Sequence, residues 1–434
     1  MLETIFYLFY VFCLAAVVCY FVLLPDQPPL SGVYSQPGKF YLLKYAFFRI
    51  LYWLRQQQQK RAQHKGHGNE EGKSKAGYGV KSRTDVKEME KLQKLPESSS
   101  LAVDAVYFNA ADQKGGYLVA ASARRHKNVS QTVLMVRLAD IGLLELPSIP
   151  DTNLKRADED SKNQYGAGGL TIEPIEPMKR WRIRFEGKLR LNRDEEHLID
   201  ATLQADWTAC TDYFDFDTDM NAHALAASIA REPWSREFFQ RLRDSHQTHH
   251  EQFGDIRGTL RLHGGKSPRG QLEYQLNMRG GRDHSFGNVR SWSHFHRYAM
   301  QFVHTEDELC FNAAVVSIPN VSMSRLEFGY VFTKEGRKLA LRSIDLPLQD
   351  LGETTTAPRE YEFEFEDEEG TRYKVECEVI ARPEFYMGED GRRDAVILEQ
   401  MCRYKVNGKR GWGLSEWQYR YLDYKGRLEQ KPAE

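Results

Sequence analysis

The sequence carries no marked excess of charge of either sign. Its 60 Lys and Arg residues nearly balance its 61 Asp and Glu residues, and the formal net charge is −1 at pH 7. Proteins that bind nucleic acid by neutralising phosphates usually present a basic surface. We therefore expect no nucleic-acid partner.

Cysteine is scarce, and several catalytic motifs are missing. None of the six cysteines forms a CxxC pair, which argues against both a disulfide scaffold and a zinc site. A GxSxG elbow is absent, and no dinucleotide-binding fingerprint follows a strand. The sequence thus predicts no cofactor and no metal centre.

Long uncharged hydrophobic runs are absent except at the N-terminus. Ile5 to Leu24 carries no charge, and about 20 apolar residues at 1.5 Å each cross a hydrocarbon core of roughly 30 Å. We predict a transmembrane helix over residues 1–25; a cleaved signal peptide is the alternative. Basic residues follow the run, which predicts a single-pass protein with a cytoplasmic C-terminal body in a membrane that the sequence does not identify.

Residues 26–100 read as a basic amphipathic segment followed by a linker. The stretch 39–55, KFYLLKYAFFRILYWLR, fits either a helix on a bilayer surface or a helix packed on the folded body. Residues 56–100 are polar and include QQQQ and PESSS. Such composition buries little apolar surface, so this part is predicted to be disordered.

From residue 101 onward the pattern changes to the alternation of half-buried strands. In 180–191, RWRIRFEGKLRL, apolar and basic residues alternate. Glycine-containing turns separate further strand pairs, which predicts an antiparallel meander, and closing a meander into a barrel removes its exposed edges. We expect an all-β body of two barrels over 101–245 and 246–434, with a helical insertion near 222–252.

Two groups of polar residues are candidates for chemistry. His246, His249 and His250 have the spacing of one helical face, and they fit either a metal site or a solvated helix end. The stretch 280–298, GGRDHSFGNVRSWSHFHRY, is expected to make a glycine turn and to re-enter a strand near His296. Asp283 beside His284 is a candidate acid/base couple, and the alternative is a polar plug whose members satisfy one another.

The stretch GRDHSFGNVRSW resembles a motif of the superfamily that contains carotenoid hydratases, tocopherol cyclases and AttH-like proteins. The resemblance covers about 101–434, including GWGLSEWQYR, and is closest to the N-terminal half of animal phosphoenolpyruvate-synthase-like phosphotransferases. It implies two lipocalin-like barrels, with Phe286 where the superfamily usually has tryptophan. The candidate ligand-binding residues are Arg282, Phe286, Arg290, Trp292 and Trp417.

Three functions remain open from the sequence. The first is a membrane-anchored protein that binds a hydrophobic ligand, such as a lipid or isoprenoid, inside its barrels. The second, implied by the resemblance, is a hydratase or cyclase that protonates an alkene, with Asp283 and His284 as acid and base. The third is a scaffold without catalysis that partners a separate phosphotransferase.

Overall fold

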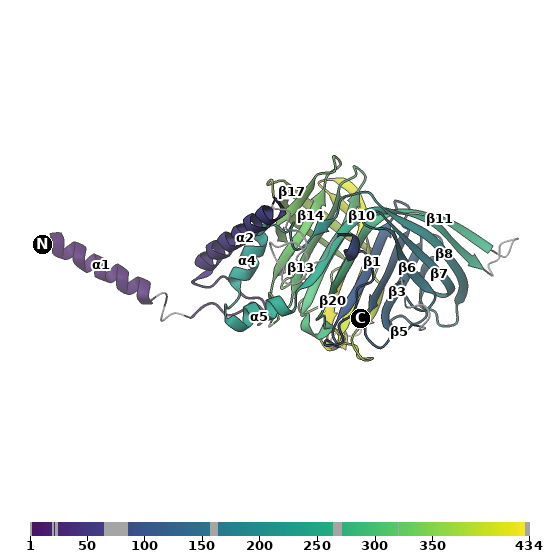
Figure 1. The fold of residues 1–434 in the computed structure, drawn as a ribbon, viewed down its shortest axis with the longest axis horizontal. Coiled ribbons are helices and arrows are strands. Elements are labelled where there is room, and N and C mark those ends of the chain that lie inside the picture. The colour runs from purple at the N-terminus through teal and green to yellow at the C-terminus, as the bar shows by residue number, and fades with distance from the viewer. Residues whose placement is uncertain are drawn as a thin grey trace.

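The computed structural model describes residues 2–19, 21, 25–64, 86–156, 164–263, 271–319 and 321–429. The main strands form two closed antiparallel barrels of eight strands each, packed side by side (Figure 1). The prediction of a mostly β body with two lipocalin-like barrels is confirmed.

The first barrel closes because strand β11 pairs with both β1 and β10. Short strands β5 (Asn153–Lys155), β6 (Leu170–Glu176) and β9 (Phe214–Asp215) pair at its margins. Its eight strands are β1 (Val103–Ala111), β2 (Tyr117–Arg124), β3 (Val129–Leu138), β4 (Gly142–Glu145), β7 (Arg180–Leu191), β8 (Leu198–Ala209), β10 (Gln247–His263) and β11 (Gln271–Gly287).

The second barrel closes through pairing of β17 with β19, and strand β18 (Glu384–Met387) pairs with β19 from outside the ring. Its eight strands are β12 (Arg297–Thr305), β13 (Cys310–Ser317), β14 (Leu326–Phe332), β15 (Lys338–Asp345), β16 (Glu360–Asp367), β17 (Arg372–Ala381), β19 (Ala395–Val406) and β20 (Lys409–Arg420).

The predicted boundary between the barrels at residue 245 is wrong. Strands β10 and β11, residues 247–287, complete the first barrel, and the second begins only at β12. The helical insertion is shorter than expected, since it comprises α4 (Ala222–Arg231) and α5 (Arg236–Asp244). His249 and His250 therefore lie on strand β10, and strand alternation places them on opposite faces.

The glycine pair at 280–281 lies inside strand β11 and forms no turn. A Cβ on Gly280 would come 2.0 Å from the backbone oxygen of Asn109 on β1, and one on Gly281 would come 2.7 Å from the ring of Phe302. These glycines let β11 approach its neighbours closely, which is a known use of glycine within strands. The sequence alone does not distinguish a glycine pair inside a strand from a glycine pair that forms a turn.

We expect Gly280→Ala to lower the free energy of unfolding by about 3 kcal/mol, because the added methyl group overlaps backbone atoms that cannot move aside. Urea-induced unfolding measures this change. Gly426→Ala is the matched control: nothing lies within 4 Å of its Cβ position in helix α6 (Tyr421–Glu429). That substitution should be neutral or slightly stabilising. Equal effects of the two substitutions would contradict the close-approach argument.

The remaining helices lie outside the barrels. They are α1 (Leu2–Val18), α2 (Tyr41–His64), α3 (Val86–Met89) and the short 3-10 helix η3 (Trp292–His294). Figure 1 shows α2, α4 and α5 gathered at one side of the barrels, with α1 projecting away from them. In the described part of the chain, no helix combines the length and the apolar character needed to cross a bilayer. The predicted transmembrane span includes residues 20 and 22–24, which lie outside the described residues.

The predicted disorder of 56–100 is wrong at both ends of that stretch. Helix α2 continues to His64, and the segment from Val86 packs against the first barrel. Met89 and Glu90 are 1% and 0% exposed. Residues 65–85 of the predicted linker lie outside the described residues. Glu90, a charged residue of this polar segment, is thus buried. The composition of the segment gives no sign of that burial.

The core follows the predicted alternation and continues from one barrel to the other. Trp181, Ile183 and Phe185 are buried, whereas the residues between them are more exposed. Between the barrels, the rings of Tyr107 on β1 and Phe302 on β12 lie 5.8 Å apart. Strands β1 and β11 on one side and β12 and β20 on the other are thus part of the interface between the barrels.

Candidate functional site

Asp283 and His284 do not form a couple. They are consecutive residues of strand β11, so their side chains point to opposite faces. His284 lies inside the first barrel, 2.9 Å from Oδ1 of Asp104. Asp283 faces a cavity between the two barrels. The two residues therefore belong to two separate sites. His284 belongs to the interior of the first barrel, and Asp283 belongs to the cavity between the barrels.

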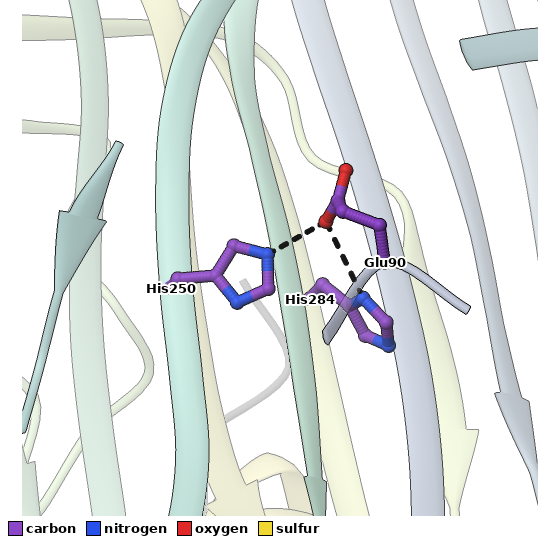
Figure 2. A group of neighbouring side chains, drawn as sticks. All are labelled: Glu90, His250 and His284. Carbon is purple, nitrogen blue, oxygen red and sulfur yellow. Dashed lines mark hydrogen bonds and ion pairs between the residues drawn. The ribbon is translucent and has the colours of Figure 1, made fainter. Parts of the chain in front are cut away.

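The first place is a buried charge cluster in the first barrel, formed by Glu90, Asp104, His250, Arg282 and His284. Figure 2 shows one carboxylate oxygen of Glu90 joined to both histidines. Its carboxylate accepts hydrogen bonds from Arg282 at 2.9 and 3.1 Å, and it lies 2.8 Å from Nε2 of His250. The Arg282 guanidinium also lies over the rings of Trp181 and Trp207, at 5.4 and 5.1 Å.

Opposite charges set the protonation states of this cluster. Burial alone would raise the pKa of Glu90, but Arg282 and the two histidines hold it well below its usual value. Burial lowers the pKa of His250 to about 4. For His284, burial is outweighed by hydrogen bonding to Asp104 and Glu90, and its pKa rises to about 8. At neutral pH the cluster therefore pairs two carboxylates with Arg282 and protonated His284.

Glu90, His250 and His284 place one ligand atom each within 4.8 Å of one another, a spacing that a metal ion can span. The carboxylate is already saturated, because Arg282, the indole of Trp181 and a backbone N–H all donate to it. A cation would displace these bonds and face the Arg282 guanidinium. The donor set therefore fits an ion-pair cluster that stabilises the barrel, and it does not fit a metal centre.

The raised pKa of His284 predicts a pH dependence of stability. A folded-state pKa of about 8 against 6.5 when unfolded adds about 2 kcal/mol below pH 6.5. This contribution is lost as the pH rises through 8. Urea unfolding at pH 6 and pH 9 should show the loss in the wild type and in the exposed control His263→Gln, but not in His284→Gln. The same decline in His284→Gln would contradict the assignment.

The second place is the inter-barrel cavity, which has a volume of about 290 Å³. Its walls come from β1, β2, β10 and β11 of the first barrel and from β12, β13, β14 and β18–β20 of the second. Most of the wall is apolar and includes the side chains of Phe216, Trp292, Phe295, Met300, Phe328 and Phe385. Ionisable side chains also face it, among them those of His249, Asp283, Arg290 and Glu416.

His249 and Asp283 form an acid/base group at one wall of the cavity, and buried Glu251 lies beside His249. Nε2 of His249 lies 3.1 Å from Oε1 of Glu251 and 3.9 Å from Oδ2 of Asp283. Its ring stacks on Phe216 with centroids 4.2 Å apart. Burial would lower the pKa of His249, but the two carboxylates raise it. Burial raises the pKa of Asp283, while the cationic His249 and Arg290 oppose that rise.

A second pair of carboxyl groups lies on strands β19 and β20, and one of them, Glu416, lines the cavity. Glu399 and Glu416 are paired across these strands. The hydroxyl of Tyr298 donates to Glu416 at 2.5 Å, and that of Tyr107 donates to Glu399 at 2.6 Å. Burial raises the pKa of Glu416 to about 7 and holds that of Glu399 well above its usual value. A carboxyl group with a pKa of about 7 exchanges its proton near neutral pH, and Glu416 is such a group.

The predicted ligand-binding residues divide among three places. Arg290 and Trp292 line the cavity, and Arg290 donates to Gln247 while Trp292 donates to Gln131 at 3.4 Å. Arg282 is in the buried charge cluster. Phe286 lies on β11 with its ring 5.4 Å from that of His284. Trp417 is in the core of the second barrel, where its indole donates to Ser415.

Sequence reasoning missed Glu416, Glu399 and the role of His249. Glu399 interrupts the apolar run AVILEQMC, and Glu416 lies within GLSEWQY. An acidic residue inside an apolar strand signals a buried carboxyl group that needs a hydrogen-bonding partner. His249 was placed on a helical face, although it belongs to a strand.

Comparison with known proteins identifies the family of this chain. A family of unknown function, DUF8627, matches residues 12–419. The chain belongs to this family. Because the match runs from α1 to β20, the DUF8627 family includes both barrels and the segment that carries Glu90. None of the curated proteins matches the chain.

Several solved structures are similar to this DUF8627 protein at low sequence identity. An AttH-like protein from Nitrosomonas europaea has a TM-score of 0.47 at 9% identity, and the match covers 75% of this chain and 94% of that one. Kievitone hydratase from Nectria haematococca has a TM-score of 0.44 at 12% identity, covering 80% and 98%. The protein CghA has a TM-score of 0.45 at 9% identity, covering 75% and 89%. None of these matches supports the relation to phosphotransferases, and none is close enough to indicate a reaction.

Proposed function

We propose that this protein is an acid–base enzyme that protonates a double bond of an apolar small molecule in the inter-barrel cavity, and so hydrates or cyclises it. The observation that carries the proposal is Glu416, a carboxyl group with a pKa of about 7 on the wall of a mostly apolar cavity. Such a group is a proton donor matched to neutral pH. The sequence resemblance to hydratases and cyclases points to the same class of reaction.

In the proposed reaction each of these groups has a role. Glu416 transfers its proton to one carbon of the double bond, and the other carbon becomes electron-deficient. Water then attacks that carbon and gives a proton to Asp283, so that one molecule of water is added. In a ring closure, a second double bond of the same molecule takes the place of water, and Asp283 accepts the proton lost from carbon. His249 and Arg290 donate hydrogen bonds to the polar end of the substrate.

The cavity suits a small substrate with a large apolar part. Its volume of about 290 Å³ lies at the lower end of the usual range for ligand pockets, about 300–1,000 Å³. Aromatic walls such as Phe216 and Trp292 fit unsaturated hydrocarbon and attract developing positive charge. A lipid or isoprenoid fragment has this character.

The proposal is tested by incubating the purified full chain with a cellular lipid extract in deuterium oxide. Proton transfer to carbon leaves carbon-bound deuterium in the product of either reaction, which mass spectrometry detects. We expect labelled products with the wild type and with Glu364→Gln, an exposed control on β16. A lipid that binds reproducibly but gains no deuterium would overturn the enzyme proposal and favour a binding protein.

A further inference from the structure

Helix α2 turns its apolar face outward. Its inner face packs on the body: the hydroxyl of Tyr45 lies 2.7 Å from Nδ1 of His223, that of Tyr52 donates to the backbone of Met220, and Phe48 is buried. The opposite face exposes large apolar side chains at 54–74% of their surface, namely Leu42, Leu43, Phe47, Ile50 and Trp53. Contiguous exposure of this kind marks an interaction surface.

The charges on α2 are of one sign. Its sequence, YLLKYAFFRILYWLRQQQQKRAQH, contains five basic residues and no acidic one. Arg49 and Arg55 are exposed next to the apolar face. A leucine- and phenylalanine-rich face bordered by cations complements the surface of a bilayer that contains anionic lipids.

Helix α1 indicates lipid rather than a protein as the occupant. Its exposed side chains include large apolar ones at consecutive positions from Ile5 to Phe12. Consecutive residues point in all directions around a helix, so every side of α1 is apolar. A protein partner covers one side of a helix, whereas lipid surrounds all of it. A lipid environment also suits the apolar outer face of α2.

An apolar track joins this face to the inter-barrel cavity. The ring of Phe47 on α2 lies 6.0 Å from Trp234, and Trp234 lies 5.2 Å from Phe239 on α5. Phe239 is 38% exposed. Leu242, three residues further along the same helix, lines the cavity. A molecule leaving the outer face of α2 therefore meets apolar side chains up to the cavity.

We infer that the outer face of α2 and the adjoining face of α5 rest on a lipid bilayer, and that the inter-barrel cavity takes its substrate from that bilayer. The second part rests on the proposed function. The substrate class is then a lipid-soluble molecule that partitions into membranes.

Photo-crosslinking tests the contact with the full chain in vesicles of phosphatidylcholine and phosphatidylserine that contain a diazirine-labelled phosphatidylcholine. Labelling is expected at 42–54 and at Phe239, in addition to α1. In the double variant Leu43→Glu, Ile50→Glu the labelling of α2 should fall about tenfold, because the two introduced carboxylates oppose burial of this face in the acyl region. Leu198→Glu is the control, since Leu198 is 43% exposed on β8, which Figure 1 places on the side away from α2. Labelling confined to α1 would overturn the inference.

The delivery of substrate is tested separately. The turnover rate is measured with the lipid that gains deuterium supplied in vesicles and with the same lipid dissolved in detergent, and the two rates are compared. The double variant should lose turnover from vesicles and keep turnover from detergent. Unchanged rates in both conditions would refute delivery from the bilayer and leave the proposed function standing. No turnover by the wild type in either condition would refute the proposed function, and the labelling of α2 would still decide the membrane contact.

Discussion

Glu90→Ala is expected to lower the free energy of unfolding by about 3–5 kcal/mol. Removing the carboxylate leaves the Arg282 guanidinium buried without its counter-charge, at 0% exposure, and deprives His250 and the indole of Trp181 of their partner. Breaking a buried pair from one side is far more harmful than losing an exposed pair, because the remaining charge has no water to solvate it. Urea unfolding followed by circular dichroism measures the loss.

The control for this prediction is Glu88→Ala, two residues away. Glu88 pairs with Lys91 on the surface, where its side chain is 56% exposed, so the loss should be about 0–1 kcal/mol. If Glu90→Ala does not fold, Glu90→Gln keeps the size and some hydrogen bonds of the side chain and should be destabilised less. Equal stability of the Glu88 and Glu90 variants would show that the buried charge cluster does not stabilise the barrel.

Glu416→Gln is expected to lower kcat for the proposed reaction by about 10²–10⁴-fold, the usual contribution of a general acid. Only the protonated carboxyl group can donate, and its pKa is about 7. The wild-type rate should therefore fall to half near pH 7 and decrease about tenfold per pH unit above it. The amide cannot titrate, so the residual rate of the variant should lack this decline.

Rates measured from pH 5 to 9 on the product found by deuterium labelling provide the test, with Glu364→Gln as the unaffected control. A variant that retains the wild-type rate and the same pH profile would remove Glu416 from the mechanism. The wild-type rate should also fall at the acidic end of the profile, where Asp283 becomes protonated and can no longer accept a proton. Asp283→Asn removes this base, so the residual rate of that variant should lack the acidic fall.

The fold was predictable because its pattern is local, whereas the site was not. Alternation in 180–191 indicates a strand directly, and glycine turns indicate the meander. The predicted couple of Asp283 and His284 is wrong, because consecutive side chains of a strand point to opposite faces. The pairing of Glu90 with Arg282 joins residues 192 positions apart, and no local pattern encodes such a contact. Glu399 and Glu416 are visible only as acidic residues within apolar strands.

The closure of the first barrel by β11 also bears on how the chain is made. Asp104 at the start of the barrel meets His284 across 180 residues, so the ring cannot close until the ribosome has released β11. At about 5–20 residues per second, the earlier strands wait for roughly ten seconds or more with an open edge. Open edges invite pairing with other chains. Strand β1 therefore keeps an unpaired edge during synthesis until β11 pairs with it.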